Sequence, residues 1–451
     1  MIGGSRSATY DAAVIRRLAL AFILLAATQS APALPPSGDA GAAVRTASTL
    51  LFTTFYRKLD AHAVVDAERL ALIDRLHELH AKRSALPAVS RSLTATNAPA
   101  AAASEAQAAV ASGLPQSDAV AVSLKAITAA THDRYTTYFT PGEYKQFDQL
   151  LDPQTLSGIG VLLDVDEQTK FIRAFFVVPD TPADRAGLKS GDLLESIDGS
   201  STRGWSIADA HRHLVGKTGT TLTMTYAHPG ASSPQTVSIE RATVKPPTVY
   251  FSMLPRSIAY IYVATFGNDT AREFHTAVQR SEAAGACGYV VDLRDDGGGI
   301  VNVALQISSE FVSSGPLVSI ENNGGEIDTF EADDDAIAPK PLAVLVNGYS
   351  ASASEITAAA IAESGTGVLV GTKTFGKGVV QSVTRFNDGS AIKITTGRYF
   401  TPQNHDINGH GIVPGVVVQE NPKAVFGKVD QDAQLARAVQ VVEERLPFKR
   451  V

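Results

Sequence analysis

Three serines in a turn of small residues are the first candidates for chemistry in this chain. The segment 347–356 reads NGYSASASEI and is predicted to connect a strand to a helix. A serine at a helix N-terminus can be a nucleophile, because the helix dipole favours the alkoxide and the Ala353 N–H can help to bind an oxyanion. The structural alternative is that the serines cap the helix, with Ser354 at the N-cap. The local sequence leaves both interpretations open, together with the choice among Ser350, Ser352 and Ser354.

A serine nucleophile needs a base, and Lys377 is the better candidate for it. This lysine lies in the segment GTKTFGKGVVQ at 371–381, next to Phe375 and apolar residues of a predicted strand. Burial in such surroundings can lower a lysine pKa by about 3–5 units, which would make the amine a base near neutral pH. None of the ten histidines lies in a recognisable triad context. The residues therefore suggest a Ser/Lys pair, which their spacing alone does not prove.

A glycine-rich segment is a third candidate for chemistry. The segment 290–299 reads VVDLRDDGGG, a predicted strand that runs into three glycines and then a helix. Such glycines free backbone N–H groups that suit an anion or an oxyanion. No Lys-Ser/Thr pair follows, as in a P-loop, and the G-x-G-x-x-G spacing of dinucleotide-binding proteins is absent. On its own, this segment does not identify an oxyanion site or any other function.

The composition excludes several classes of function. The chain has 451 residues with a formal net charge of −7, so no basic surface is predicted that could bind nucleic acid or an anionic membrane. Its single cysteine, Cys287, excludes an intrachain disulfide and a cysteine metal cluster. The acidic run 331–335 lacks the glycine and final glutamate of a calcium loop and is predicted to be a solvated loop. No metal and no cofactor is expected.

The N-terminus is typical of an export signal, predicted at residues 1–33. Two arginines at 16–17 precede the apolar run 18–27, and small residues follow at 30–33. The apolar run is too short to span a bilayer comfortably. We therefore expect cleavage after Ala33 and export to the periplasm, with an uncleaved membrane anchor as the alternative.

The remaining chain falls into four parts by its sequence patterns. Residues 34–155 form a helix-rich region, in which the Ala-rich stretch 94–113 is predicted to be a linker or a loosely ordered insertion. Short strands with two helices are predicted for 156–245. Strands and helices alternate through 246–420, which indicates a layered α/β domain, and 421–451 is a C-terminal helical segment.

The order of the strands and helices in 156–245 resembles a circularly permuted PDZ domain of the kind found in processing proteases. Four residues take the place of its carboxylate-binding loop: Gly158, Ile159, Gly160 and Val161. Glycines allow successive N–H groups to point at a terminal carboxylate, and a strand edge can pair with an extended peptide tail. The structural alternative is a PDZ-like fold used as a rigid spacer.

Taken together, residues 117–420 resemble the C-terminal processing peptidases, also called tail-specific proteases. The resemblance implies a multidomain α+β protein with a helical N-terminal region, a PDZ domain and an α/β core of the ClpP/crotonase type. It selects one serine of the three, because the family's nucleophile and base are 25 residues apart, as Ser352 and Lys377 are. It further implies that Gln381 orients the lysine amine and that the oxyanion hole is formed by the N–H groups of Gly298 and Ala353.

Two departures from the family pattern stand out. The family usually has Asn-Asn-Pro-Gly-Gly where this chain has DDGGG at 295–299, so a more flexible oxyanion loop is expected. The N-terminal region before about residue 115 matches weakly, which leaves its role, dimerisation or partner docking, open.

The function implied is an exported serine endopeptidase that cuts protein chains near their C-termini and recognises apolar tails through Ile159 and Val161. One alternative is a catalytically inactive PDZ scaffold. A crotonase-like acyl-CoA enzyme is another, but it explains neither the Ser352/Lys377 spacing nor the PDZ segment. The physiological substrate, an activating adaptor protein and a homo-oligomeric state are not determined by the sequence.

Overall fold

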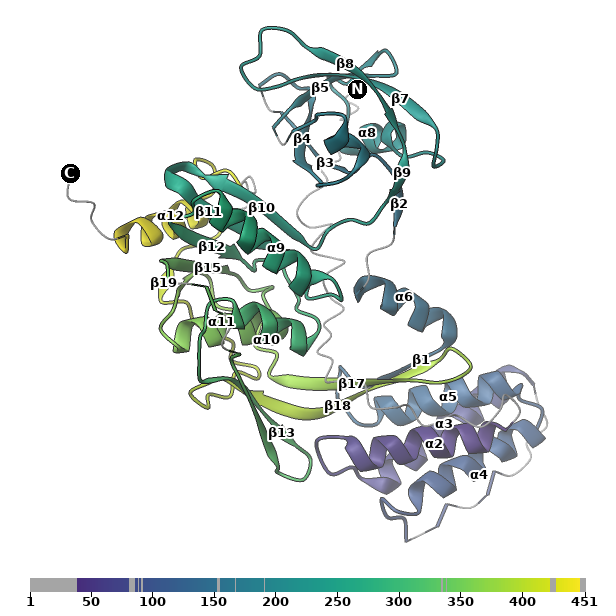
Figure 1. The fold of residues 1–451 in the computed structure, drawn as a ribbon. Coiled ribbons are helices and arrows are strands. Elements are labelled where there is room, and N and C mark those ends of the chain that lie inside the picture. The colour runs from purple at the N-terminus through teal and green to yellow at the C-terminus, as the bar shows by residue number, and fades with distance from the viewer. Residues whose placement is uncertain are drawn as a thin grey trace, which may run out of the picture. The chain divides into compact units, whose positions relative to one another are not determined.

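The chain forms two compact units. The computed structural model describes residues 39–446, apart from 81–85, 88, 91, 152–154, 167, 190, 334–335, 338 and 422–426. The smaller unit comprises Asp152–Tyr250, and the larger one combines the chain before and after it (Figure 1). The predicted export signal lies outside the described residues. None of the helices that the structure describes combines the length and the apolar character needed to cross a bilayer.

The larger unit begins with four helices that pack around an apolar core. These are α2 (Ala40–Thr54), α3 (Ala61–Glu78), α4 (Ala98–Ala111) and α5 (Gln116–Ala129). The first two start at aspartates, Asp39 and Asp60, whose carboxylates accept N–H groups of the first turn. Their buried faces share a cluster that includes Leu51, Ala106 and Leu124.

Helix α4 corrects the prediction for the Ala-rich stretch 94–113, which is not a linker. Alanine has the highest intrinsic helix propensity, and Pro99 lies in the first turn, where a missing N–H costs nothing. The small side chains also allow α4 to lie close to α2. At Gly41 of α2, a Cβ atom would lie 2.5 Å from the side chain of Gln107. An alanine-rich segment with low amphipathicity is therefore a buried helix here.

A six-stranded sheet forms the centre of the larger unit. Its order is β10-β11-β12-β15-β16-β19, and the ladder from β11 onward is parallel. The strands are β10 (Val249–Leu254), β11 (Ile258–Val263), β12 (Gly288–Asp292), β15 (Leu342–Val346), β16 (Val368–Gly371) and β19 (Val416–Val417). The helices of this layer are α9 (Thr270–Ala283), α10 (Val301–Ser309), α11 (Ala353–Glu363) and α12 (Ala433–Glu444). The alternating pattern predicted for this part of the chain is present.

A second sheet joins the helical region to this core. Strand β18 (Ala391–Phe400) pairs with β1 (Thr137–Phe139), β13 (Pro316–Asn322) and β17 (Val379–Arg385), and β14 (Ile327–Glu331) completes the sheet. Because β1 follows α5 directly, the helices are connected to the core by backbone hydrogen bonds along β18. Helix α6 (Pro141–Leu151) follows β1.

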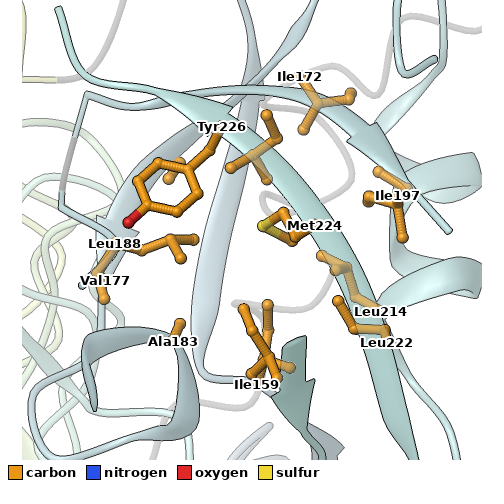
Figure 2. Packing of buried hydrophobic residues seen from close by; sticks show 14 residues of the cluster. Ile159, Ile172, Val177, Ala183, Leu188, Ile197, Leu214, Leu222, Met224 and Tyr226 are labelled. Atoms are coloured by element: carbon orange, nitrogen blue, oxygen red, sulfur yellow. The ribbon is translucent and has the colours of Figure 1, made fainter. Parts of the chain in front are cut away.

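The smaller unit has its own sheet and its own core. Its main sheet runs β3-β4-β5-β7-β8, with β6 paired to β5, and β2 pairs separately with β9. The elements are β2 (Leu156–Gly158), β3 (Val161–Val165), β4 (Ile172–Val177), α7 (Pro182–Arg185), β5 (Leu193–Ile197), β6 (Ser200–Ser201), α8 (Ile207–Leu214), β7 (Thr221–Ala227), β8 (Gln235–Glu240) and β9 (Ala242–Val244). Figure 2 shows its core, in which Met224 and Tyr226 of β7 face Leu188 and Ile159. The predicted multidomain α+β class is confirmed.

Candidate active site

Three neighbouring strands carry the three segments in which chemistry was predicted. Strand β12 pairs with β15, and β15 pairs with β16, all in parallel. The glycine-rich segment follows β12, the serine turn follows β15, and the Lys377 segment follows β16. Since the carboxyl ends of parallel strands lie at the same edge of a sheet, the topology brings the segments together.

The hydroxyl groups of the three serines differ in their contacts. Ser350 Oγ donates to the Leu293 carbonyl oxygen at 2.7 Å, and Ser354 Oγ donates to the Asp296 carbonyl oxygen at 3.0 Å. Both hydroxyls thus hold the serine turn against the glycine-rich segment. Ser352 Oγ is buried and donates no hydrogen bond to any described residue. Of the three serines, only Ser352 has a hydroxyl whose proton is not already donated to a backbone carbonyl. The N-cap of α11 is Ser352, so the prediction of Ser354 at the N-cap is wrong.

The backbone of Ser352 has a conformation that non-glycine residues rarely adopt. Its φ is +64° and its ψ is −116°, which costs on the order of 1–3 kcal/mol. Hydrogen bonds hold it there: the Ser352 N–H donates to Glu355 Oε2 at 2.9 Å, and the Tyr399 hydroxyl donates to the Ser352 carbonyl oxygen at 3.3 Å. The strained turn presents Ser352 at the helix N-terminus.

Glu355 connects the serine turn to the lysine segment. Its Oε2 accepts the Ser352 N–H and the Lys377 N–H, each at 2.9 Å, so the two nitrogens are no further apart than twice that distance. Its Oε1 accepts the Gly376 N–H at 2.8 Å and the Thr374 hydroxyl. Burial raises the pKa of Glu355, although these hydrogen bonds act in the opposite direction. Sequence reasoning missed this residue, and its signal was a glutamate three positions after a helix-capping serine.

Lys377 is completely buried, as predicted. Burial lowers the pKa of its amine well below the usual lysine range, and the nearby positive charge of Lys393 lowers it further. The Nζ atom lies over the ring of Tyr135, 4.7 Å from its centroid. Tyr135 belongs to the loop between α5 and β1, so the helical region contributes to this site. Nothing in the local sequence marked that contribution.

Gln381 is also buried, and its side-chain amide group is anchored at one end. Nε2 donates to the Val379 carbonyl oxygen at 3.3 Å and to Thr395 Oγ1 at 3.4 Å. Oε1 makes no hydrogen bond with a described residue. The amide can therefore offer its oxygen to a donor, as its predicted role requires.

Gly298 lies directly against the serine turn. Its φ is +93°, and a Cβ atom here would lie 2.5 Å from the Ala351 carbonyl oxygen and 2.8 Å from the Ala353 nitrogen, so only glycine fits. The two predicted oxyanion donors are thus neighbours. Ala353 is the first residue of α11, and its N–H has no acceptor within the helix.

The Gly298 N–H already has an acceptor, which the sequence did not predict. It donates to Asp296 Oδ1 at 2.8 Å. Asp296 is fully buried, and burial raises the pKa of its carboxyl group well above the usual range. In this conformation, one of the two predicted oxyanion donors is therefore bound within the chain.

Comparison with known proteins identifies the family. Residues 257–418 match the model of peptidase family S41, and residues 177–227 match that of the PDZ domain. The carboxyl-terminal-processing protease of Picosynechococcus sp. is 31% identical over 321 residues, which are 70% of this chain and 77% of that protein. This chain belongs to the C-terminal processing protease family.

Further relatives are similar over comparable lengths. The carboxy-terminal processing protease CtpA of Bacillus subtilis is 32% identical over 310 residues, 68% of this chain and 66% of that protein. The solved structure of a photosystem II D1 C-terminal processing protease is 27% identical, covers 82% of this chain and 96% of its own, and has a TM-score of 0.44. The family predicted from the motifs is confirmed, and the smaller unit is a PDZ domain.

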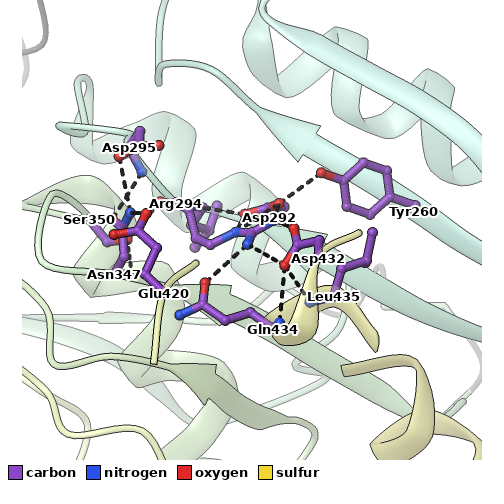
Figure 3. Close-up of polar contacts among 11 residues, drawn as sticks. Tyr260, Asp292, Arg294, Asp295, Asn347, Ser350, Glu420, Asp432, Gln434 and Leu435 are labelled. Atoms are coloured by element: carbon purple, nitrogen blue, oxygen red, sulfur yellow. Dashed lines mark hydrogen bonds and ion pairs between the residues drawn. The ribbon is translucent and has the colours of Figure 1, made fainter. Parts of the chain in front are cut away.

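In the protease core, a buried ionic network holds the strand end before the glycine-rich segment (Figure 3). Arg294 binds Asp292 Oδ2 at 2.6 Å and Asp432 Oδ2 at 2.7 Å, and its Nη1 donates to Gln434 Oε1 at 3.0 Å. Asp432 is the N-cap of α12. The network therefore fastens the C-terminal helix to the β12 end from which the Gly298 loop starts.

The four predicted tail-binding residues run from the end of β2 to the start of β3 in the PDZ domain. Gly158 ends β2, Gly160 has a φ of +84° beside Thr181, and Val161 begins β3, the first strand of the sheet. Ile159 is only 2% exposed and points into the core. The Ile159 side chain packs in the core of the domain, and its contact with an apolar tail stays a prediction.

Proposed function

We propose that Ser352 is the nucleophile and Lys377 the general base of this C-terminal processing protease. The observation that carries the proposal is that Ser352 alone of the three serines has a hydroxyl that donates no hydrogen bond to a described residue. One oxygen of the Glu355 carboxylate also accepts the backbone N–H groups of both Ser352 and the buried Lys377. The neutral amine takes the Ser352 proton, and Oγ attacks the scissile carbonyl carbon. The ammonium then protonates the leaving amine as the C–N bond breaks, and water hydrolyses the acyl-enzyme.

The oxyanion of the tetrahedral intermediate would be bound by the N–H groups of Ala353 and Gly298. Because Gly298 donates to Asp296 in the free enzyme, we propose that the substrate oxygen replaces or shares that acceptor. Because burial raises the pKa of the Asp296 carboxyl group, its negatively charged form, which would oppose the oxyanion, is disfavoured.

We further propose that the PDZ domain recognises the C-terminal tail of the substrate. Its strand β3 is at a sheet edge, with helix α8 beside it, so an extended tail can add to the sheet between them. Apolar tails remain the expected class through Val161, which begins that strand. The export-like N-terminal sequence supports a periplasmic protease, and an adaptor protein that activates it is compatible with tail-dependent cleavage.

The test is digestion of an unfolded protein with an apolar C-terminal tail. We expect cleavage by the wild type and by Ser364→Ala, an exposed control in the turn after α11, but not by Ser352→Ala or Lys377→Ala. Replacing the tail by charged residues should slow cleavage. Wild-type turnover by Ser352→Ala would refute the nucleophile assignment.

Absence of cleavage by the wild type, even after addition of tail peptides, would instead favour an inactive PDZ scaffold. Equal cleavage of the substrates with apolar and with charged tails would support the proposed protease activity but contradict the proposed tail recognition.

A further inference from the structure

A chain of hydrogen bonds runs from Gln381 to the N-terminal helical region. Gln381 and Thr395 are opposite each other on β17 and β18, directly after an irregularity in the register between Val380 and Gln381. Such a bulge re-aims the side chains that follow it. Gln381 Nε2 lies 3.4 Å from Thr395 Oγ1, and both residues are completely buried.

The direction of these hydrogen bonds follows from the last member of the chain. Thr395 Oγ1 donates a hydrogen bond to Asp133 Oδ2, and a hydroxyl group has one proton to donate. The Thr395 hydroxyl must therefore give its proton to Asp133, which leaves its oxygen as an acceptor for Gln381. Only the NH₂ end of the Gln381 amide can satisfy that acceptor, so Oε1 must point away from Thr395.

Asp133 is itself held in place by the loop between α5 and β1. Its Oδ2 accepts the Thr136 hydroxyl at 2.7 Å, and its Oδ1 accepts the Tyr135 N–H at 3.3 Å. The Thr395 N–H donates to Thr136 Oγ1 at 3.0 Å, which fixes the loop against β18. The same loop places the Tyr135 ring under the Lys377 amine. The helical region thus reaches both the predicted base and the residue predicted to orient it.

We propose that Asp133 and Thr395 are positioning residues that hold the Gln381 amide with its oxygen free to accept a hydrogen bond from Lys377. The N-terminal helical region is then a part of the active site rather than only an accessory. The inference rests on the proposed function, because it assigns Gln381 to the lysine amine. Without Thr395 or Asp133, the amide could turn its NH₂ end toward the amine and donate a hydrogen bond to the lone pair that must take the Ser352 proton.

The test is the rate at which Ser352 reacts with a fluorophosphonate probe, measured as a single turnover across pH. Thr395→Val removes the hydroxyl with little change of shape. Asp133 still accepts the hydrogen bond from the Thr136 hydroxyl in this variant. We expect the acylation rate to fall about threefold to tenfold, the value of one hydrogen bond, with probe binding unchanged. Thr395→Ser keeps the hydroxyl and should react at the wild-type rate.

A double-mutant comparison separates positioning from a structural effect. If Thr395 acts through Gln381, Thr395→Val should cost nothing further in a Gln381→Ala background. An equal loss in both backgrounds, or a wild-type rate for Thr395→Val, would overturn the inference. Should Thr395→Val not fold, Thr395→Ala gives the same comparison, because it also removes the hydroxyl that accepts the Gln381 NH₂ group.

Failure of the proposed function would look different. In that case the wild type and Ser352→Ala would react with the probe alike, whatever the residue at position 395.

Discussion

At the residue scale, burial and a second lysine, Lys393, together lower the pKa of the predicted base, Lys377. Lys393 is 8% exposed, its Nζ lies over the rings of Phe139 and Phe147, and burial lowers its pKa to about 8. Below that pH it carries a positive charge that disfavours a second charge on Lys377. The neutral form of the Lys377 amine, which the mechanism needs, is therefore favoured by desolvation first and by like-charge repulsion second.

Replacing Lys393 by methionine should shift the pH dependence of cleavage. Without the neighbouring charge, the pKa of Lys377 rises, so the acidic limb of kcat/KM should move to higher pH, and activity below pH 8 should fall. Lys393→Arg keeps a cation and is the matched control. An acidic limb that stays in place, or moves to lower pH, would show that Lys393 does not act on the base.

Single residues also show which parts of the site could be predicted. Ser352, Lys377 and Gln381 lie in short local patterns, and a known spacing connects the first two. Thr395 and Asp133 are 262 residues apart in the chain, and no local pattern announces a contact of that kind. Asp296 was noticed only as a departure from the family, because its bond to the Gly298 N–H exists only in the folded loop.

At the element scale, helix α4 shows how an apolar pattern can be misread. Its alanine-rich sequence, interrupted by Asn97 and Pro99, predicts a linker or a loosely ordered insertion. The alternating strands of the α/β part, among them β12, β15 and β16, were predicted correctly. Small side chains carry little periodic signal but pack closely, and only the contact with α2 reveals which face is buried. The order of the strands in the sheets was equally invisible, since pairing is a tertiary property.

Close packing of α4 predicts that a larger side chain is not tolerated there. Ala106 is completely buried, so Ala106→Leu should destabilise the protein by about 1–3 kcal/mol through overpacking. Ala111→Leu, at an exposed position of the same helix, should change the free energy of unfolding by less than about 0.5 kcal/mol. Denaturant unfolding measures both, and similar effects of the two variants would mean that α4 is not packed as described.

At the scale of the whole molecule, the chain forms two compact units, of which the smaller is the PDZ domain and the larger contains the serine turn. The PDZ domain has a core of its own. The larger unit instead joins its parts tightly: β1 and the 131–136 loop connect the helices to the site, and Arg294 fastens the C-terminal helix to it. Substitutions far from Ser352, in the N-terminal helices or in α12, are therefore expected to lower the rate of cleavage.

The helical region also contains a buried acid that should make stability depend on pH. Burial raises the pKa of Glu68 in α3 from 4.5 to about 8, and the Glu105 carboxylate adds a smaller rise. Between those pH values the unfolded chain has released this proton and the folded chain has not. Stability should therefore fall as pH rises through that window, by up to about 1.4 kcal/mol per pH unit.

Glu68→Gln should remove this dependence. The variant and the wild type should differ least near pH 4, and the variant should gain relative stability as the pH approaches 8. Glu78→Gln, at an exposed position of the same helix, should show no such trend. Denaturant unfolding of the full chain across this range measures the difference. A constant difference between Glu68→Gln and the wild type would mean that Glu68 ionises in the folded protein as it does in the unfolded chain, and that water reaches the middle of the helical region.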